Sequence, residues 1–173
     1  MAARVLQTRG EEVGYQGRKK AKTSNMLPVP DGNGSSIATT GVLAGNHNDS
    51  SMLEQKLKQV LTDLQRCGLD YQDAVFTLDS SFDTRAARKL LWNRGVKPNS
   101  AENKRNRKTI KRGRKRHFNP AVYKHRFVSE RTFARIDKFK TLLIRFERKA
   151  AYCLGFHHLA FALINLRGAF AKV

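Results

Sequence analysis

The sequence predicts a mixed α/β fold in which short strands alternate with amphipathic helices. Turn signals separate short segments of β-branched and apolar residues, and two longer stretches repeat apolar side chains at helical spacing. Along the chain, the predicted order is hairpin, helix, strand, helix, strand, helix. For a chain of 173 residues, one domain with a modest hydrophobic core is the expected size class.

A β-hairpin is the first predicted element. The segment 25–29 becomes apolar after a polar start, and Asp31-Gly-Asn-Gly34 is a strong turn signal. The segment 37–43 on the far side is rich in β-branched residues, which suits a strand. The chain is therefore expected to reverse at this turn.

An amphipathic helix is predicted next. Five apolar side chains recur at helical intervals before Gly68: Leu53, Leu57, Val60, Leu61 and Leu64. Ser51 and Glu54 have the spacing of a capping box, in which each side chain accepts a hydrogen bond from the other residue's backbone N–H. The helix is therefore expected to be capped at Ser51.

A strand, a second helix and a second strand follow. Residues 74–79 form a short apolar strand. Asp83 is placed to cap a helix over 84–94, and Gly95 after its end favours a left-handed C′ position. Residues 96–99 then predict another short strand.

Two helices complete the pattern. Asn119-Pro120 predicts a cap and a first helical residue, from which one helix is expected to run through Glu130. A final helix places apolar side chains at alternating spacings of four and three residues: Tyr152, Phe156, Leu159, Leu163, Leu166 and Phe170. We expect this stripe to pack against the rest of the protein.

The composition indicates a polyanionic partner. Lys and Arg number 34 against 14 Asp and Glu, which gives a formal charge of +20. A surplus of this size repels itself unless a polyanion neutralises it, so DNA or RNA is the expected partner. An acidic membrane surface is the competing target, but no apolar run reaches the roughly 18 residues that span a bilayer. The N-terminal residues lack an export signal, so a cytoplasmic location is expected.

The segment 104–116 is the most basic part of the chain and contains no acidic residue. Its basic side chains are Lys104, Arg105, Arg107, Lys108, Lys111, Arg112, Arg114, Lys115 and Arg116. Three interpretations are open: a solvated charge run, a phosphate-binding arm, or a nuclear-localisation-like cluster. Phosphate binding fits best, because such contacts release counterions and give affinity without sequence specificity.

Asp79 is the first candidate for chemistry. It leaves the carboxyl end of a predicted strand, where open α/β sheets hold their ligands. From the residues alone, a functional role and an ordinary loop role remain equally open. Glu130 is a second candidate, and its alternative role is a surface ion pair with Arg126 or Arg131. On one continuous helix, four polar side chains would share a face: Tyr123, Arg126, Glu130 and Asp137.

Four stretches together resemble a known family: Ala44-Gly-Asn-His-Asn-Asp49, Asp79-Ser-Ser-Phe-Asp83, Asn99-Ser-Ala-Glu-Asn103 and Glu130-Arg-Thr-Phe-Ala-Arg-Ile-Asp-Lys138. They resemble bacterial insertion-sequence transposases of the DDE, ribonuclease-H-like superfamily. Within it, the closest group is the one called insertion-sequence five. The resemblance covers Gly10 to Arg167, nearly the whole chain.

This resemblance implies an incomplete ribonuclease-H-like α/β fold, with a mixed sheet, flanking helices and a C-terminal helical segment. The implied parts are a basic polar segment over 1–24, a truncated catalytic core over 25–147 with the basic loop 104–116, and an apolar helix over 148–173 that packs on the core.

The resemblance also implies that one carboxylate is missing. In the family, the first catalytic Asp lies on the first strand, upstream of a segment that resembles Arg9 to Lys20. Residues 1–8 contain no Asp or Glu, so the chain is not expected to supply this group. Loss of the first strand would leave its two neighbours, the hairpin and the strand before Asp79, without backbone partners.

For the site, the resemblance implies that Asp79 and Glu130 are catalytic carboxylates and metal ligands. Phosphodiester cleavage and strand transfer by this route use hard divalent cations, which makes Mg²⁺ the expected cofactor. Tyr123 and Arg126 match the family's spacing before Glu130, with Arg126 expected to clamp a phosphate or carboxylate. The family's Lys seven residues after the Glu is replaced by an acid here, and the adjacent base Lys138 is the candidate DNA contact.

The chain thus resembles the C-terminal part of an insertion-sequence transposase that is expected to be inactive alone. The expected partners are double-stranded DNA, transposon ends, and either an upstream transposase fragment or further copies of this chain, with no membrane. The alternative is a non-catalytic basic nucleic-acid-binding protein or a regulator of transposition. Convergence of Asp79 and Glu130 discriminates between the two, because a purely binding role gives no reason for it.

Overall fold

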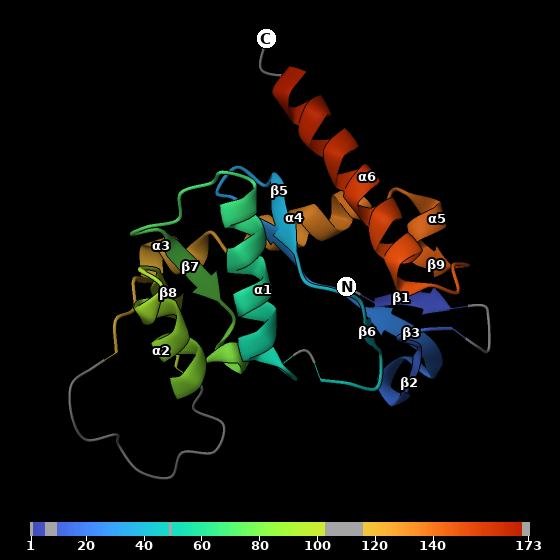
Figure 1. Cartoon of the computed structure of the whole chain (residues 1–173), viewed down its shortest axis with the longest axis horizontal. Helices are drawn as coiled ribbons and strands as arrows, with labels where there is room; N and C mark the ends of the chain where they lie inside the picture. The colour runs from blue at the N-terminus through green and yellow to red at the C-terminus, as the bar shows by residue number, and fades with distance from the viewer. Residues whose placement is uncertain (1, 6–9, 49, 103–115, 171–173) are drawn as a thin grey trace. The chain divides into compact units, whose positions relative to one another are not determined.

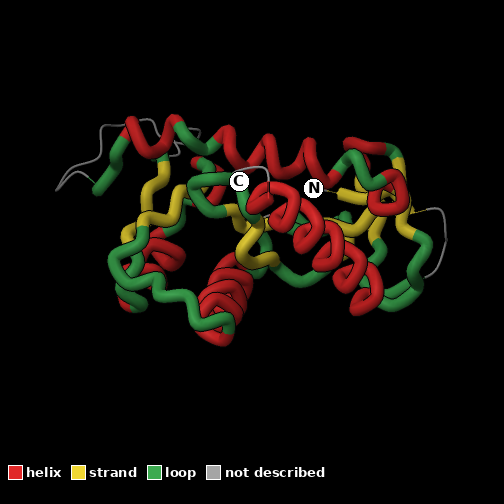
Figure 2. The backbone as a smooth tube through the Cα atoms, turned by 90° about the horizontal axis from the view of Figure 1, so that it is seen from above, coloured by secondary structure: helices red, strands yellow, loops and turns green. Residues whose placement is uncertain are grey.

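The computed structural model describes residues 2–5, 10–48, 50–102 and 116–170, and every structural statement below concerns this part of the chain. It contains both helices and strands, as the sequence predicted (Figure 1). The strands are short beside the helices, as the tube in Figure 2 makes clear.

The chain divides into two compact units. The first contains Met1–Ser51 and Val128–Val173, and the second contains Met52–Phe127. The three parts expected over 1–24, 25–147 and 148–173 stay a prediction. Strand β3 (Ala21–Asn25) includes residue 24 and pairs on both sides.

The main sheet of the first unit contains five short strands: β1 (Ala2–Val5), β2 (Gly14–Gln16), β3, β6 (Leu43–Ala44) and β9 (Ile144–Arg145). Their order is β2-β3-β1-β9, with β6 also paired to β3. β1 runs antiparallel to β3 and parallel to β9. A strand from the start of the chain therefore fills an interior place in the sheet, so the expectation of a missing first strand is wrong in this respect. Its second neighbour is β9 and not the strand that leads to Asp79.

The predicted hairpin is present. β4 (Pro28–Pro30) and β5 (Ser36–Thr39) pair antiparallel in a sheet of their own. Asp31 stabilises the turn because its Oδ1 accepts a hydrogen bond from the backbone N–H of Asn33. Gly34 has a φ of 90°, in the left-handed region that glycine adopts without strain.

Three helices complete the first unit: α4 (Phe127–Ile136), α5 (Lys140–Leu143) and α6 (Ala150–Phe170). They share a hydrophobic cluster made of Met26, Ile136, Leu142, Ala160 and Phe161. α4 also holds the hairpin turn, because Thr132 Oγ1 and Arg135 Nη1 each donate a hydrogen bond of 3.3 Å to Gly34 O.

α6 confirms the predicted final helix but not the burial of its stripe. The six stripe residues are 40–75% exposed. The helix packs on the first unit through a different face, made of Cys153, His157, Ala160 and Phe161. The spacing of the stripe identified an apolar face, but no sequence pattern indicates which of the two apolar faces is buried.

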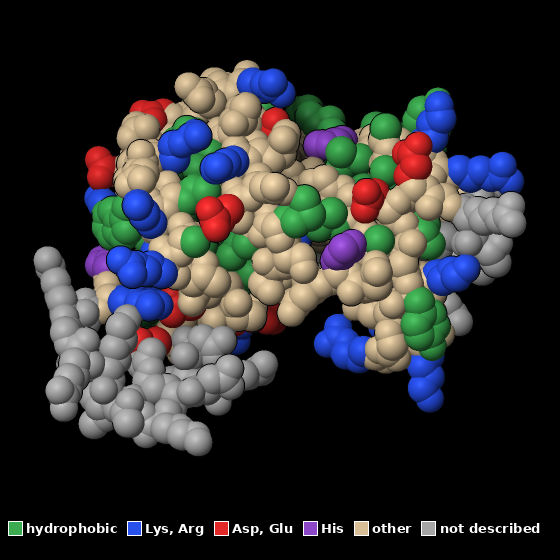
Figure 3. Space-filling view, turned by 60° about the horizontal axis from the view of Figure 1, so that its bottom comes forward, with side chains coloured by type: hydrophobic (Ala, Val, Ile, Leu, Met, Phe, Trp, Pro, Cys, Tyr) green, Lys and Arg blue, Asp and Glu red, His purple; other side chains and the backbone are tan. Residues whose placement is uncertain are grey.

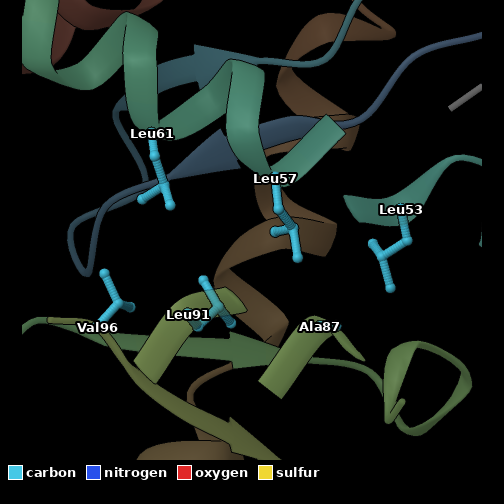
Figure 4. Close-up of a cluster of buried hydrophobic side chains, with 6 residues drawn as sticks. All are labelled: Leu53, Leu57, Leu61, Ala87, Leu91 and Val96. Carbon is cyan, nitrogen blue, oxygen red and sulfur yellow. The ribbon is translucent and has the colours of Figure 1, made fainter. Parts of the chain in front are cut away.

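The second unit contains four helical segments and two strands: α1 (Leu53–Arg66), β7 (Val75–Leu78), the 3₁₀ helix η2 (Ser80–Phe82), α2 (Arg85–Asn93), β8 (Lys97–Ser100) and α3 (Pro120–Lys124). β7 and β8 are parallel and are connected through α2. All five apolar residues predicted for α1 are buried. Figure 4 shows leucines of this face pointing toward Ala87, Leu91 and Val96.

Two predicted helix caps are wrong. α1 begins after Met52, which has a left-handed φ of 55° and makes no side-chain capping hydrogen bond. Ser51 does not cap the helix, because it belongs to the preceding turn and its backbone N–H donates to Asn48 O. α2 is capped by Thr84, whose Oγ1 accepts from Ala87 N at 3.1 Å, and not by Asp83. The predicted C′ glycine is confirmed by the positive φ of Gly95.

Among the described residues, no helix is both long and apolar enough to cross a bilayer.

Candidate active site

Asp79 stands where the sequence predicted, directly after β7. Its Oδ1 accepts a hydrogen bond of 2.7 Å from Ser80 N, which caps η2. The side chain is exposed, and its Oδ2 has no hydrogen bond to any described residue. Asp79 therefore keeps one carboxylate oxygen directed at solvent and available to a ligand.

Tyr123 of α3 reaches Asp79 across 44 positions of sequence. Its hydroxyl donates to Asp79 Oδ1 at 3.4 Å. The Tyr123 ring makes an edge contact with Phe118, with centroids 5.3 Å apart. The Arg126 guanidinium lies 5.5 Å from the centroid of the same ring, within the range of a cation–π contact. The structure thus brings Asp79, Tyr123 and Arg126 together within the second unit.

An asparagine pair explains why α3 lies beside β7 and β8. Asn99 on β8 is fully buried, and its Nδ2 donates to Asn119 O at 3.1 Å. In return, Asn119 N donates to Asn99 Oδ1 at 2.7 Å. The Asn119 side chain also caps α3, as predicted, by accepting from Ala121 N and Val122 N. These hydrogen bonds between Asn99 and Asn119 hold α3, the helix that carries Tyr123, in place.

Asp83 is the centre of a buried ion-pair network. Its side chain is only 2% exposed. Oδ1 accepts from Arg88 Nε at 2.6 Å and from Ser100 Oγ at 3.2 Å, while Oδ2 accepts from Arg116 Nη1 at 2.6 Å. Arg88 also donates to Ser100 O and His117 O. Asp83 therefore joins α2, β8 and the residues before α3.

Little in the sequence indicated this network. Arg88 sits on the apolar face of α2 between Ala87 and Leu91, and a charged residue there was the one available signal. Ser100 and Arg116 are distant in sequence, and no local pattern links them to Asp83. Arg116 was predicted as a DNA contact, but its Nη1 is engaged by Asp83.

Glu130 lies on α4 in the first unit, whereas Asp79 lies in the second. The side chain of Glu130 is exposed and forms no hydrogen bond or ion pair with a described residue. The surface pair with Arg126 or Arg131 is therefore not formed among the described residues. Lys138 is also exposed and follows the end of α4.

The single helix predicted through Glu130 is wrong. α3 ends at Lys124 and α4 begins at Phe127, with His125 N and Arg126 N donating to carbonyls three residues back. This tightened turn ends α3, so the side chains from Tyr123 to Asp137 do not share one helical face. Of the predicted group, Tyr123 and Arg126 remain in contact with each other, and Tyr123 also contacts Asp79.

The other basic side chains predicted to contact DNA, from Lys104 to Lys115, lie outside the described residues. Lys and Arg side chains also stand on several parts of the face drawn in Figure 3, with hydrophobic side chains between them. On this face, the basic side chains of the described residues therefore lie in several separate places.

A divalent cation can be tested against these donors. Within the described ranges, no group of three or more His, Cys, Asp or Glu side chains is arranged to hold a metal. Asp79 Oδ2 nevertheless has what a hard cation requires, namely an unpartnered carboxylate oxygen held in place through the other oxygen. The described residues therefore fit one anchoring ligand of a metal site.

Comparison with known proteins supplies a family. A family model described as DDE superfamily endonuclease matches residues 3–165. No curated protein and no solved structure matches the chain.

Proposed function

Because the chain belongs to the DDE superfamily endonucleases, we propose that it serves DNA transposition as the C-terminal part of an insertion-sequence transposase. The cluster of Asp79, Tyr123 and Arg126 carries this proposal. A free carboxylate oxygen, a hydroxyl that orients it and an exposed guanidinium meet at the end of a parallel strand, where open α/β sheets hold ligands. The proposed group is the one called insertion-sequence five.

The proposed fold is ribonuclease-H-like. Support comes from the main sheet, in which β1 has an antiparallel hairpin, β2 and β3, on one side and a parallel strand on the other. In this proposal, Glu130 serves the same catalytic centre as Asp79 despite the 51 positions between them.

Each side chain has a distinct role in the proposed site. Asp79 and Glu130 would hold Mg²⁺, which when bound assists the attacking water or 3′-hydroxyl and the leaving oxygen. The Tyr123 hydroxyl restrains Asp79 Oδ1, so that Oδ2 stays directed at the ligand. Arg126, whose guanidinium has no carboxylate partner among the described residues, would bind the phosphate with its planar fork.

A third carboxylate is needed to bridge a pair of cations, and residues 1–8 contain none. We infer that residues 1–173 neither cut nor join DNA without a further segment or chain that brings an Asp to the site. The basic segment 104–115 would bind the DNA backbone, and Lys138 would contribute from α4.

The test is nicking and end-joining of DNA with Mg²⁺ or Mn²⁺ by the purified chain, alone and after addition of a fragment that carries the family's first catalytic Asp. The chain alone is expected to be inactive. The combination is expected to cleave, and Asp79→Ala or Glu130→Ala should abolish the cleavage, whereas Lys58→Ala on the surface of α1 should not.

Metal-dependent cleavage by the unaided chain that is lost in Asp79→Ala would refute the inferred incompleteness. Cleavage by the combination that survives both carboxylate substitutions would refute the site itself. A combination that binds DNA but never cleaves it would favour the non-catalytic binding role.

A further inference from the structure

α6 has two apolar faces, and only one of them is used within the described structure. The buried face packs on the core of the first unit through Ala160 and Phe161. Asn165 also ties the helix to β5 by exchanging hydrogen bonds with Ser36, at 3.1 Å and 2.9 Å. At 100° per residue, the exposed stripe from Tyr152 to Phe170 is centred about 125° away from the buried face. α6 is therefore held rigidly while presenting a second face to solvent.

The spacing along the exposed stripe has a specific meaning. Its residues alternate at intervals of four and three positions, so that Tyr152, Leu159 and Leu166 form one set seven positions apart, and Phe156, Leu163 and Phe170 form a second. This is the repeat with which two helices pack along each other, each side chain inserting between four residues of the facing helix. A helix that covers a sheet or a globular core generally has a wider and less regular face.

The other described helices offer no matching stripe. α1 and α2 bury their apolar faces against each other (Figure 4). α4 buries Val128 and Ile136 in its own unit, and α3 and α5 have five and four residues. Among the described helices, the surface complementary to α6 is therefore a second α6. We propose that this stripe is a dimer interface that binds α6 of a second copy of the chain.

Charge favours this face over the rest of the surface. Two chains of formal charge +20 repel each other, so contact requires a region without basic side chains. Arg167 is the only Lys, Arg, Asp or Glu between Ala150 and Phe170, and it lies outside the stripe. Lys149, just before the helix, lies 5.6 Å from the centroid of the Tyr152 ring, so the region without basic side chains is the remainder of the stripe, from Phe156 to Phe170. The flanking positions Gly155, Ala162 and Ala169 are small, which lets two helix backbones approach closely.

The size of the stripe is sufficient. Large apolar side chains present roughly 200 Å² each when fully exposed, so six that are about half exposed present on the order of 600 Å² per chain. Two chains would bury on the order of 1,200 Å², which is the lower end of specific protein interfaces. Because α6 is already ordered by its other face, association does not have to fold the helix.

Analytical ultracentrifugation of the full chain tests the proposal, in high salt and without DNA so that electrostatic bridging is absent. The expected species is a dimer with twice the 19.6 kDa chain mass. Leu163→Glu, near the middle of the stripe, should weaken dimerisation about 100-fold or more, because it buries an unpaired charge. Gly168→Glu is the matched control on the same helix, since a side chain there meets nothing within 4 Å, and it should leave the dimer intact.

Each other outcome overturns the proposal. A parent chain that stays monomeric, with Leu163→Glu lowering its unfolding temperature, would mean that the stripe is covered within the chain. Monomers that float with anionic lipid vesicles would assign the stripe to a membrane surface. A dimer that persists in Leu163→Glu, or that is equally lost in Gly168→Glu, would place the interface elsewhere. Circular dichroism of both variants checks that they are folded.

Discussion

Asp79 and Asp83 lie four residues apart and have opposite surroundings. Asp79 is exposed and keeps one oxygen free, while Asp83 is buried with both oxygens bonded to arginines. A carboxylate with spare coordination capacity can bind a ligand, whereas one surrounded by cations stabilises the fold. The same motif therefore contains a structural acid, Asp83, and the acid that we propose as a metal ligand, Asp79.

Substitution of these two residues should separate the roles. Asp83→Asn is expected to lower the free energy of unfolding by about 3–5 kcal/mol, because it leaves Arg88 buried without its counter-charge. Asp79→Asn, the same chemical change on an exposed side chain, should alter stability by less than about 0.5 kcal/mol. Urea unfolding followed by circular dichroism measures both. Equal losses in the two variants would contradict the assignment of Asp83 as the structural acid.

The buried His157 on α6 makes the stability of the folded state depend on pH. Burial lowers its pKa, and its Nδ1 donates a hydrogen bond of 2.7 Å to Cys153 O, so the folded state holds a neutral imidazole. The unfolded chain takes up this proton as the pH falls through about 6.5, while the folded chain resists it. The stabilisation is therefore fully present above that pH and is lost progressively below it.

His157→Gln should consequently flatten the decline of unfolding temperature between about pH 7 and about pH 5. His158→Gln, at the exposed neighbouring position, should retain the slope of the parent chain. A parent chain whose stability rises on acidification, or a His157→Gln variant with an unchanged slope, would contradict the buried neutral imidazole.

In helix α1, the spacing of the apolar residues predicted both the helix and its buried face. Its five apolar side chains at helical spacing are the five that the structure buries, because one amphipathic face has one place to pack. α6 is apolar on two faces, so its spacing predicted the helix but not the buried side. The break between α3 and α4 lacks a Pro or Gly, which is why no sequence signal marked it.

The candidate site was predictable in part. Asp79 could be found because a strand and a polar turn adjoin it, and Tyr123 and Arg126 because their spacing matches a family pattern. Asp83, Ser100 and Arg116 could not be grouped, because their contacts depend on tertiary folding and not on local sequence. β1 was missed because Ala-Ala-Arg-Val does not alternate clearly between apolar and polar residues.

The start of α1 contains a strained residue that can be relieved. Met52 has a φ of 55°, which costs a residue with a Cβ roughly 1–2 kcal/mol relative to glycine. Met52→Gly should therefore raise the free energy of unfolding by about 1 kcal/mol, since the side chain is 54% exposed and little packing is lost. Met52→Ala removes the same side chain but keeps the Cβ, and should give no such gain. Equal effects of the two substitutions would mean that the strain is absent in solution.

The charge of the whole chain should appear in its response to salt. With a formal charge of +20, the chain is expected to bind duplex DNA with little sequence preference, and the affinity should fall steeply as salt rises. Each phosphate contact contributes about 0.9 to the logarithmic slope, so replacing Arg112, Arg114 and Lys115 with Ala should reduce it by about 2–3. Fluorescence anisotropy over a salt series measures this slope.

A variant with the same loss of charge is the control for DNA binding. Lys58, Lys89 and Arg94 are exposed on or just after α1 and α2, and replacing them with Ala should leave the slope nearly unchanged. If the two triple variants behave alike, binding depends on overall charge and not on the segment 104–115.

We propose that Asp79 and Glu130 hold one cation. Mn²⁺ binding measured by electron paramagnetic resonance on the parent chain, Asp79→Asn, Glu130→Gln and the double variant tests this proposal most directly. Each single substitution should weaken binding about tenfold or more, and the double variant should lose less than the sum of the two single losses, because both ligands belong to one site. Unchanged binding in Glu130→Gln, or losses that simply add in the double variant, would contradict it.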